Sequence, residues 1–377
     1  MKSLRGRSAI FGTLFLVLFL GSCTKRVERD SRVVLDRAYK DEILKSRDLL
    51  AVNLLISHTG LSIAVSVDNK TVWSEGLGYA NAELRTMVKP EYKFRIGTSS
   101  RLFTSLLLLR MQERGEIDLS KKYTDYVSAE VNPEWSFSLY QLAVNSAGLD
   151  LYTDDLFREA TVKKYANLDS LLAAHRHDKL KYEVNQYFAE NTVGACMLAK
   201  AAEKVSGKTY RELFKSEVLT PFGLSETQLD YPRFVIKNKA SLYARNSIAQ
   251  VYTAEDGNIN TVAPALGILS TADDLNKLGR ALMNHEVLSA DSYHQLLEPN
   301  KLLNGDKSVW GMGIEVTEDN QGDLIYMLRG KVEGGASLLI INPKEKLVVS
   351  ICGNLSADYS SYPFTQVVGL FMDKLKK

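Results

Sequence analysis

The chain contains 377 residues, of which 45% are hydrophobic and 24% charged, enough for a large core in one or two domains. Its 47 Lys and Arg residues nearly balance its 45 Asp and Glu residues, which leaves a net charge of +2. This balance argues against nucleic acid as a partner, because nucleic-acid-binding proteins carry a basic excess.

The first 22 residues have the pattern of a signal peptide. Three basic residues (Lys2, Arg5 and Arg7) precede an apolar run at 9–20, and small residues then lead to Cys23. The run is too short to span a bilayer, which takes about 20 residues. Because its end is similar to a bacterial lipobox, we predict a lipoprotein that is cleaved, lipid-modified at Cys23 and held at a membrane of the cell envelope, facing the periplasm or the surface. An ordinary secretory signal with an incidental cysteine is the alternative.

Hydrophobic periodicity and turn residues divide the rest of the chain. The predicted elements are a charged tether (23–31), a helix (32–55), a strand hairpin (61–67 and 71–79), a mostly helical region (about 98–305), a second hairpin (338–341 and 347–352) and a final helix (about 361–375). Strands at both ends predict an α/β (α+β) fold, in which one antiparallel sheet is built from both chain ends and flanked by helices. We expect a single domain at 32–377, with the sheet subdomain at about 32–97 and 306–377.

The remaining cysteines and the histidines give no sign of a metal or cofactor. Cys196 and Cys352 lie in apolar surroundings, which predicts two buried free thiols rather than a disulfide. The five histidines show no metal-ligand spacing, and His175 and His177 would point to different faces of a helix. We therefore predict neither a metal nor a cofactor.

One segment carries the clearest functional signal. It reads Phe94-Arg95-Ile96-Gly97-Thr98-Ser99-Ser100-Arg101-Leu102-Phe103-Thr104 and opens an apolar helix after a glycine turn. It resembles the Phe-Arg-Ile-Gly-Ser-x-Ser-Lys-x-Phe-Thr segment of serine β-lactamases and penicillin-binding proteins, the class C group in particular. Segments at 76–83, 138–149, 219–224 and 263–275 are similar to further landmarks of this family, in the same order. The resemblance implies the β-lactamase-like fold of a serine hydrolase.

In that family, a Ser-x-x-Lys motif places the nucleophile and a lysine one helical turn apart. Thr98 and Arg101 stand at these two positions, and the chain after Cys23 contains no Ser-x-x-Lys. Thr98 keeps a hydroxyl group, but a guanidinium group stays protonated and cannot act as a base. Ser99 and Ser100 would point away from Thr98 around the helix. A helix N-cap is the structural alternative for Thr98.

The family's Tyr-x-Asn and His/Lys-Thr-Gly motifs also differ here. The first aligns with Glu190-Asn191-Thr192 within one residue, and the second aligns with Leu328-Arg329-Gly330-Lys331, in which only the glycine is kept. The glycine is expected to let the backbone approach a ligand closely. The resemblance implies motif positions at Thr98, Arg101 and Glu190, and ligand-binding positions at Tyr187, Asn191, Arg329, Gly330 and Lys331.

The changes at Arg101 and Glu190 are expected to be coupled. A charge left alone in a partly buried site costs about 3–5 kcal/mol. We therefore predict that Arg101 and Glu190 form a partly buried ion pair, which replaces the lysine–tyrosine contact of the family.

Three functions remain open. A catalytically impaired member of the family, a pseudoenzyme, would keep a cleft for a peptidoglycan-like peptide or a small amide or ester ligand. An active but atypical hydrolase (an esterase, a peptidase or a β-lactamase-like enzyme) would use Thr98 as nucleophile and Glu190 as base, with Arg101 and Arg329 binding a substrate carboxylate. A non-enzymatic envelope protein would bind a protein partner instead.

Overall fold

The computed structural model describes residues 32–127, 131–149, 165–319, 321–356 and 363–376. Residues Arg32–Lys377 group into one compact unit. The predicted signal peptide, the tether and Cys23 lie outside the described residues. In the described part of the chain, no helix combines the length and the apolar character needed to cross a bilayer.

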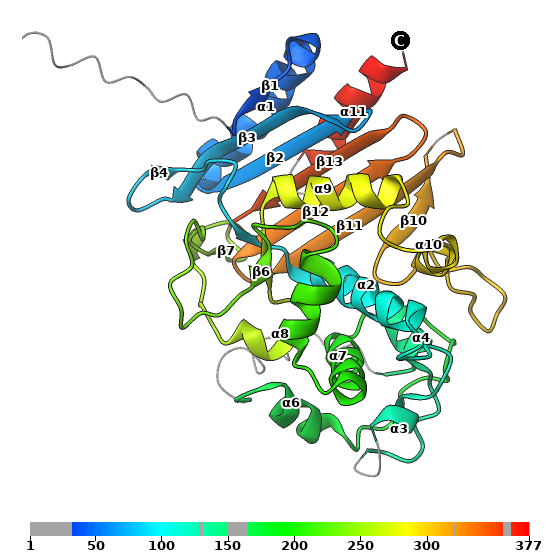
Figure 1. The fold of residues 1–377 in the computed structure, drawn as a ribbon. Coiled ribbons are helices and arrows are strands. Elements are labelled where there is room, and N and C mark those ends of the chain that lie inside the picture. The colour runs from blue at the N-terminus through cyan, green and yellow to red at the C-terminus, as the bar shows by residue number, and fades with distance from the viewer. Residues whose placement is uncertain (1–31, 128–130, 150–164, 320, 357–362, 377) are drawn as a thin grey trace, which may run out of the picture. The chain divides into compact units, whose positions relative to one another are not determined.

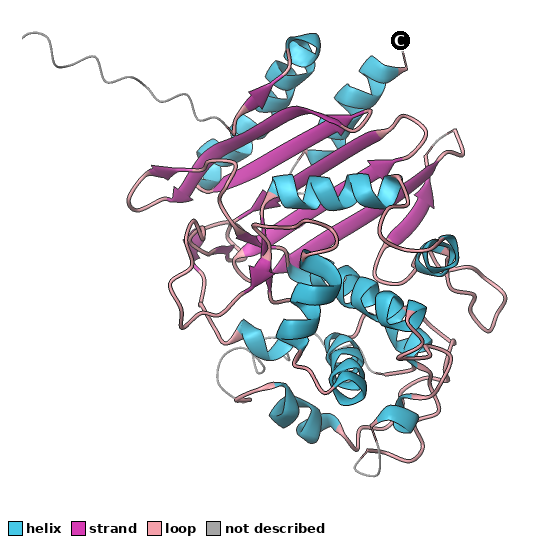
Figure 2. Cartoon of the chain, in the orientation of Figure 1, coloured by secondary structure: helices cyan, strands magenta, loops and turns pink. Residues whose placement is uncertain are grey.

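An eight-stranded antiparallel sheet is the centre of this unit (Figures 1 and 2). Its spatial order is β1-β3-β2-β13-β12-β11-β10, with β4 paired to β3. The strands are β1 (Val34–Leu35), β2 (Gly60–Val67), β3 (Lys70–Asn81), β4 (Thr86–Met87), β10 (Glu315–Glu318), β11 (Leu324–Val332), β12 (Gly335–Asn342) and β13 (Leu347–Gly353). Because β2 pairs with β13, the predicted sheet from both chain ends is confirmed.

Both predicted hairpins are present. Val67 pairs with Lys70, so β2 and β3 are joined by a two-residue turn, and its residues Asp68 and Asn69 have φ angles of 51° and 65°. Asn and Asp tolerate this left-handed conformation, which matches the twist of a hairpin. The second hairpin joins β12 to β13, with Asn342 paired to Leu347.

The start of the first predicted helix is wrong. Val34 and Leu35 form β1, which pairs with Ser74 and Trp73 of β3, and helix α1 begins only at Lys40 and ends at Ser57. Val34 and Leu35 suit a strand, and the edge of β3 offers backbone partners that local periodicity cannot reveal.

The two faces of the sheet support separate apolar clusters. Helices α1 and α11 (Phe364–Leu375) pack together behind the sheet in the view of Figure 1. In this cluster, Trp73 stacks on Phe371 with ring centroids 6.2 Å apart. Helix α9 (Ala272–Met283) covers the front face. A Cβ at Gly279 would lie 2.6 Å from Val348 Cγ1, so this glycine lets α9 approach the strands.

The described part of the region between the two halves of the sheet is only partly helical. Besides α9, its described helices are α2 (Ser100–Glu113), α3 (Tyr123–Tyr126), α4 (Leu139–Ala143), α6 (Leu168–His175), α7 (Thr192–Ser206), α8 (Tyr210–Leu213) and α10 (Ala290–Leu297). Short strands β5 (Phe94–Arg95), β6 (Gln228–Leu229) and β9 (Ile268–Ser270) form a second sheet, and β7 (Tyr243–Arg245) pairs with β8 (Val251–Thr253). The 3-10 and π turns are η1 (Arg37–Tyr39), η2 (Gly97–Ser99), η3 (Phe214–Leu219) and η4 (Ile259–Val262). Helix α9 lies within the region predicted to be helical, but it packs on the main sheet, where its apolar face is buried.

Candidate functional site

The first turn that leads into α2 lies directly against strand β11. Gly97 has a φ angle of 56°, and a Cβ there would be 2.5 Å from the Lys331 carbonyl carbon. A Cβ at Gly330 would lie 1.8 Å from the Ile96 carbonyl oxygen and 2.5 Å from Ser99 Oγ. Gly330 therefore lets this turn approach β11, whereas the sequence predicted the approach of a ligand.

This close packing sets the position of the Thr98 hydroxyl group. Thr98 Oγ1 donates to the Arg329 carbonyl oxygen at 3.0 Å and accepts from the Lys331 N–H at 3.4 Å. Thr98 is half-buried. The alternative that Thr98 caps the helix is wrong, because Ser99 occupies the N-cap position of α2 and makes no side-chain cap bond. No side chain in the described part of the chain hydrogen-bonds to Thr98 Oγ1.

The two neighbouring serines point away from Thr98, as predicted. Ser99 Oγ lies 2.9 Å from Ser337 Oγ in β12, and Ser100 Oγ accepts from the Ile268 N–H at 3.3 Å. Both serines are buried. Neither can replace Thr98 as a nucleophile.

The predicted ion pair between Arg101 and Glu190 is confirmed. Arg101 Nη1 lies 3.1 Å from Glu190 Oε2, and the two side chains are 10% and 38% exposed. The buried Arg101 Nε has no hydrogen-bond partner among the described residues. Burial raises the pKa of the nearby Cys196 thiol to about 12, and the positive charge of Arg101 offsets only part of this. Cys196 and Cys352 are both buried free thiols, as predicted.

The side-chain oxygen and the backbone N–H of Asn191 both form hydrogen bonds within the protein. Its Oδ1 accepts from the Gly194 N–H at 2.7 Å and so caps α7, and its own N–H donates to Asn145 Oδ1 at 3.3 Å. Asn191 is 4% exposed. These contacts give Asn191 a role in holding the start of α7, which the alignment with a ligand-binding asparagine did not predict.

Tyr187 lies in the same loop as Glu190 and is 53% exposed. Its ring meets the edge of Tyr182 at 5.1 Å between centroids. The Tyr187 hydroxyl makes no hydrogen bond to any residue that the structure describes, so the structure does not join it to Thr98. Next to it, Phe188 stacks on Trp310 with centroids 4.9 Å apart, which links the loop to the segment before β10.

Arg329 points toward the neighbouring strand β10. Its Nε and Nη2 atoms lie 2.8 Å and 2.5 Å from the two carboxylate oxygens of Glu315, which is nearly buried. The Arg329 side chain itself is 44% exposed, so any ligand anion would share the guanidinium group with Glu315. Sequence reasoning missed Glu315, because its contact with Arg329 depends on the pairing of β10 with β11 and no motif marks this residue.

The site therefore consists of a hydroxyl group, two arginines and two carboxylates, and no amine or imidazole of a described residue hydrogen-bonds to Thr98 Oγ1. Thr98 meets the backbone of β11, and Arg101 meets the loop before α7. Among the described residues, no group of three or more His, Cys, Asp or Glu side chains could hold a metal ion.

Comparison with known proteins agrees with this architecture. The family model described as Beta-lactamase matches residues 54–363. The chain belongs to the β-lactamase family. Within this family of serine hydrolases and penicillin-binding-protein-like proteins, it combines the fold with substituted motif positions.

Relatives in the β-lactamase family are distant. Protein flp of Staphylococcus aureus (strain COL) is 20% identical over 312 residues, which cover 80% of this chain and 60% of that protein. The human mitochondrial serine β-lactamase-like protein LACTB is 24% identical over 315 residues, which cover 66% of this chain and 57% of that protein. The chain thus spans about three fifths of the length of these curated relatives. The penicillin-binding protein homologue from Pyrococcus abyssi has the same fold, with a TM-score of 0.76, 19% identity, and coverage of 88% of this chain and 77% of that chain.

Proposed function

We propose that this protein is a catalytically impaired, membrane-anchored lipoprotein of the β-lactamase family. It binds a peptidoglycan-like peptide or a small amide or ester ligand at the Thr98 site and does not form an acyl-enzyme. The observation that carries this proposal is the Arg101–Glu190 ion pair, with 3.1 Å between Nη1 and Oε2.

The ion pair removes the base that the reaction needs. A hydroxyl group attacks a carbonyl carbon efficiently when a neighbouring group takes its proton. Arg101 stays protonated, and the Thr98 hydroxyl donates to a backbone carbonyl oxygen, which is not a base. Glu190 is held at Arg101, with 3.1 Å between Oε2 and Nη1, and no described side chain hydrogen-bonds to Thr98 Oγ1.

Membrane anchoring rests on the lipobox-like sequence that ends at Cys23. Lipid at Cys23 and a tether at 23–31 would keep the domain within about 30 Å of a membrane of the cell envelope, at up to about 3.5 Å for each residue. Metabolic labelling with an alkyne fatty acid tests the anchor, because labelling should be lost in Cys23→Ala. Equal labelling of this variant and the original chain would contradict the anchor.

A second function is favoured by one contact. The Lys331 N–H points to Thr98 Oγ1 at 3.4 Å, and backbone N–H groups of this kind can stabilise the oxyanion of acyl transfer. In an active hydrolase, Thr98 would attack the carbonyl and Glu190, released from Arg101, would take the proton.

Activity-based labelling separates the two functions. The protein is incubated with a fluorescent penicillin and with a fluorophosphonate, next to a class C β-lactamase as the positive control. Catalytic impairment predicts no covalent label on the original chain or on Thr98→Ala. A label on the original chain that is lost in Thr98→Ala would overturn the impaired function and support the hydrolase.

The double variant Thr98→Ser with Arg101→Lys shows whether the remaining machinery is intact. We expect no strong nitrocefin hydrolysis, because the second and third motifs also differ and Asn191 is committed to capping α7. Efficient turnover by this variant would show that only the first motif had been lost.

A further inference from the structure

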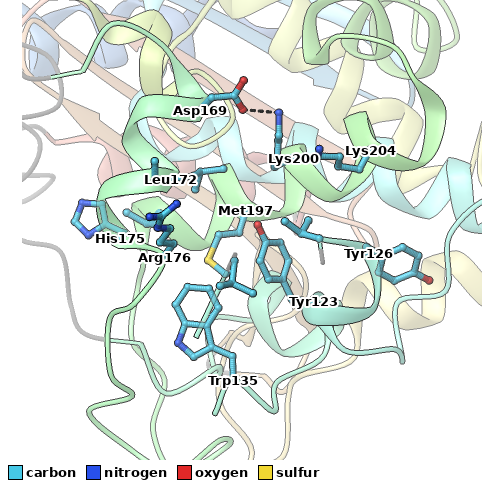
Figure 3. Close-up of a pocket in the computed structure, with 14 residues that line it drawn as sticks. Tyr123, Tyr126, Trp135, Asp169, Leu172, His175, Arg176, Met197, Lys200 and Lys204 are labelled. Carbon is cyan, nitrogen blue, oxygen red and sulfur yellow. Dashed lines mark ion pairs between the residues drawn. The ribbon is translucent and has the colours of Figure 1, made fainter. Parts of the chain in front are cut away.

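A cavity of about 510 Å³ lies between α3, α6 and α7, away from the substituted motifs. Its volume falls in the range of small-molecule sites, about 300–1,000 Å³. Thr98, Arg101 and Glu190 do not line it. The lining side chains come from three helices and from the segment that contains Trp135 (Figure 3).

One side of this cavity is apolar. The half-buried side chains of Tyr126, Val127, Val131 and Leu172 supply its accessible apolar surface. The rings of Trp135 and Tyr123 lie beside the Met197 side chain (Figure 3), and these three lining residues are almost fully covered, with exposed fractions of 4%, 2% and 1%. The Trp135 Nε1–H donates to the Asp178 carbonyl oxygen at 2.8 Å, so the polar atom of the indole ring already has a partner.

The other side of the cavity is cationic. Lys200 and Lys204 project from one face of α7 and lie near each other in Figure 3, and Arg176 follows α6. Among the described lining residues, Asp169 is the single carboxylate and pairs with Lys200, which also lies 3.4 Å from Glu203 Oε2. Lys204 has no acidic partner in the part of the chain that the structure describes. The described lining residues therefore carry more positive than negative charge.

We propose that this cavity binds an amphipathic anion, a linear acyl or alkyl chain that ends in one carboxylate or phosphate group. The chain would pack on Tyr126, Val127, Val131 and Leu172, and the anion would meet Lys204. The source is either a free fatty acid or a lipid with a phosphate headgroup, since both present this chemistry.

Calorimetric titration of the full chain tests the proposal. The probes are decanoate, decyl phosphate and decyltrimethylammonium, each below its micelle concentration. We expect decanoate or decyl phosphate to bind at least tenfold more tightly than the cation. Decanoate alone would indicate a free acid, and decyl phosphate alone would indicate a lipid phosphate. Equal binding of all three probes, or of none, would overturn the proposal.

Matched variants locate the bound probe. Ala173 and Ala174 are neighbouring exposed residues of α6, but only Ala173 lines the cavity. Ala173→Phe should fill the entrance and weaken decanoate binding at least tenfold, whereas Ala174→Phe should change it less than twofold. Circular dichroism of both variants confirms that they are folded. Equal binding by the two variants would place the probe elsewhere and reject the cavity.

A second pair tests the headgroup contact. Lys204→Gln should weaken binding of the anionic probe about tenfold, the equivalent of about 1.4 kcal/mol. Lys208→Gln removes the same charge from an exposed position outside the cavity and should have less than a twofold effect. An unchanged affinity in Lys204→Gln would reject the proposed contact. None of these variants alters Thr98 or Arg101, so the outcome is independent of the labelling experiments.

Discussion

Arg95 and Arg101 are close in the sequence, yet their charges are compensated in different ways. The Arg95 side chain is 1% exposed, and its Nε lies 2.7 Å from Asp230 Oδ2. Asp230 also pairs with Lys239 at 2.9 Å, and Asp256 contacts both Arg95 and Lys239. Arg101 instead meets the single, partly exposed carboxylate of Glu190 and keeps an unpartnered Nε among the described residues.

This difference in charge compensation distinguishes Arg95, a residue of the scaffold, from Arg101, a residue of the candidate site. Arg95 belongs to the part of the motif segment that matches the family, and its network joins β5 to the segments around β6 and β8. Arg101 stands where the family has lysine. Among the described residues, its Nη1 pairs with Glu190, whereas its buried Nε has no hydrogen-bond partner. Breaking a network that contains the fully buried carboxylate of Asp230 costs more stability than breaking a pair whose carboxylate is 38% exposed.

The largest expected effect is the loss of the Arg95 network. Arg95→Met should lower the free energy of unfolding by about 3–5 kcal/mol, because Asp230 stays fully buried with one cation fewer. Urea denaturation followed by circular dichroism measures the change. Arg37→Met, at an exposed position, should change stability by less than about 0.5 kcal/mol. A loss below about 1 kcal/mol for Arg95→Met would show that the network is not essential to the scaffold.

The contact between β11 and the first turn before α2 comes next. Gly330→Ala should cost about 1–3 kcal/mol, because its Cβ would overlap the Ile96 carbonyl oxygen. Gly369→Ala in α11 is the matched control, since no atom lies within 4 Å of the added Cβ. It should raise stability by up to about 1 kcal/mol through helix propensity. If both variants have the same stability in thermal melts, the close approach at Gly330 is not real.

A smaller effect is expected for the ion pair of the site. Glu190→Gln should cost about 1–2 kcal/mol, since it leaves the Arg101 guanidinium group without a carboxylate while water still reaches the pair. Adding Arg101→Met should recover most of this loss, and a double-mutant cycle measures the coupling. Glu183→Gln, at an exposed position of the same loop, serves as control. Additive effects of the two changes would mean that Arg101 and Glu190 are not coupled.

The smallest effect concerns Asp273, an acid of the scaffold that forms no ion pair with the described residues. Burial raises the pKa of Asp273, and the hydrogen bond from Ser74 Oγ (2.8 Å) offsets this only in part. The native state then holds the proton more tightly than the unfolded chain, so stability falls as the pH rises from about 3.8 through the raised native pKa.

Asp273→Asn removes this pH dependence. The variant should be more stable than the original chain at pH 7, by about 1.4 kcal/mol for each unit by which the native pKa is raised, and the difference should shrink toward pH 4. Asp291→Asn, at an exposed first-turn position of α10, should show no such trend. Thermal melts from pH 4 to 7 test this, and a constant difference would contradict the assignment.

Several features of the site could be predicted from the sequence, because they follow from spacing along one helix or from the charges of the residues. The position of Ser99 and Ser100 on other faces follows from helix geometry, and the pairing of Arg101 with Glu190 follows from charge compensation. The cap at Asn191 and the pairing of Arg329 with Glu315 could not be predicted, since they depend on strand register and loop path. The short strand β1 was missed for the same reason.

The sequence by itself determined the family and the sheet from both chain ends, because both follow from ordered motifs and local periodicity. It also places Arg101, and not a lysine, three residues after Thr98. Only the tertiary structure decided where the Thr98 hydroxyl points, which glycine serves packing rather than ligand binding, and where the cavity beside α7 lies. These features depend on atoms far apart in the sequence. Thr98 and Arg329 meet because β11 packs against the turn before α2, and no local pattern encodes that contact.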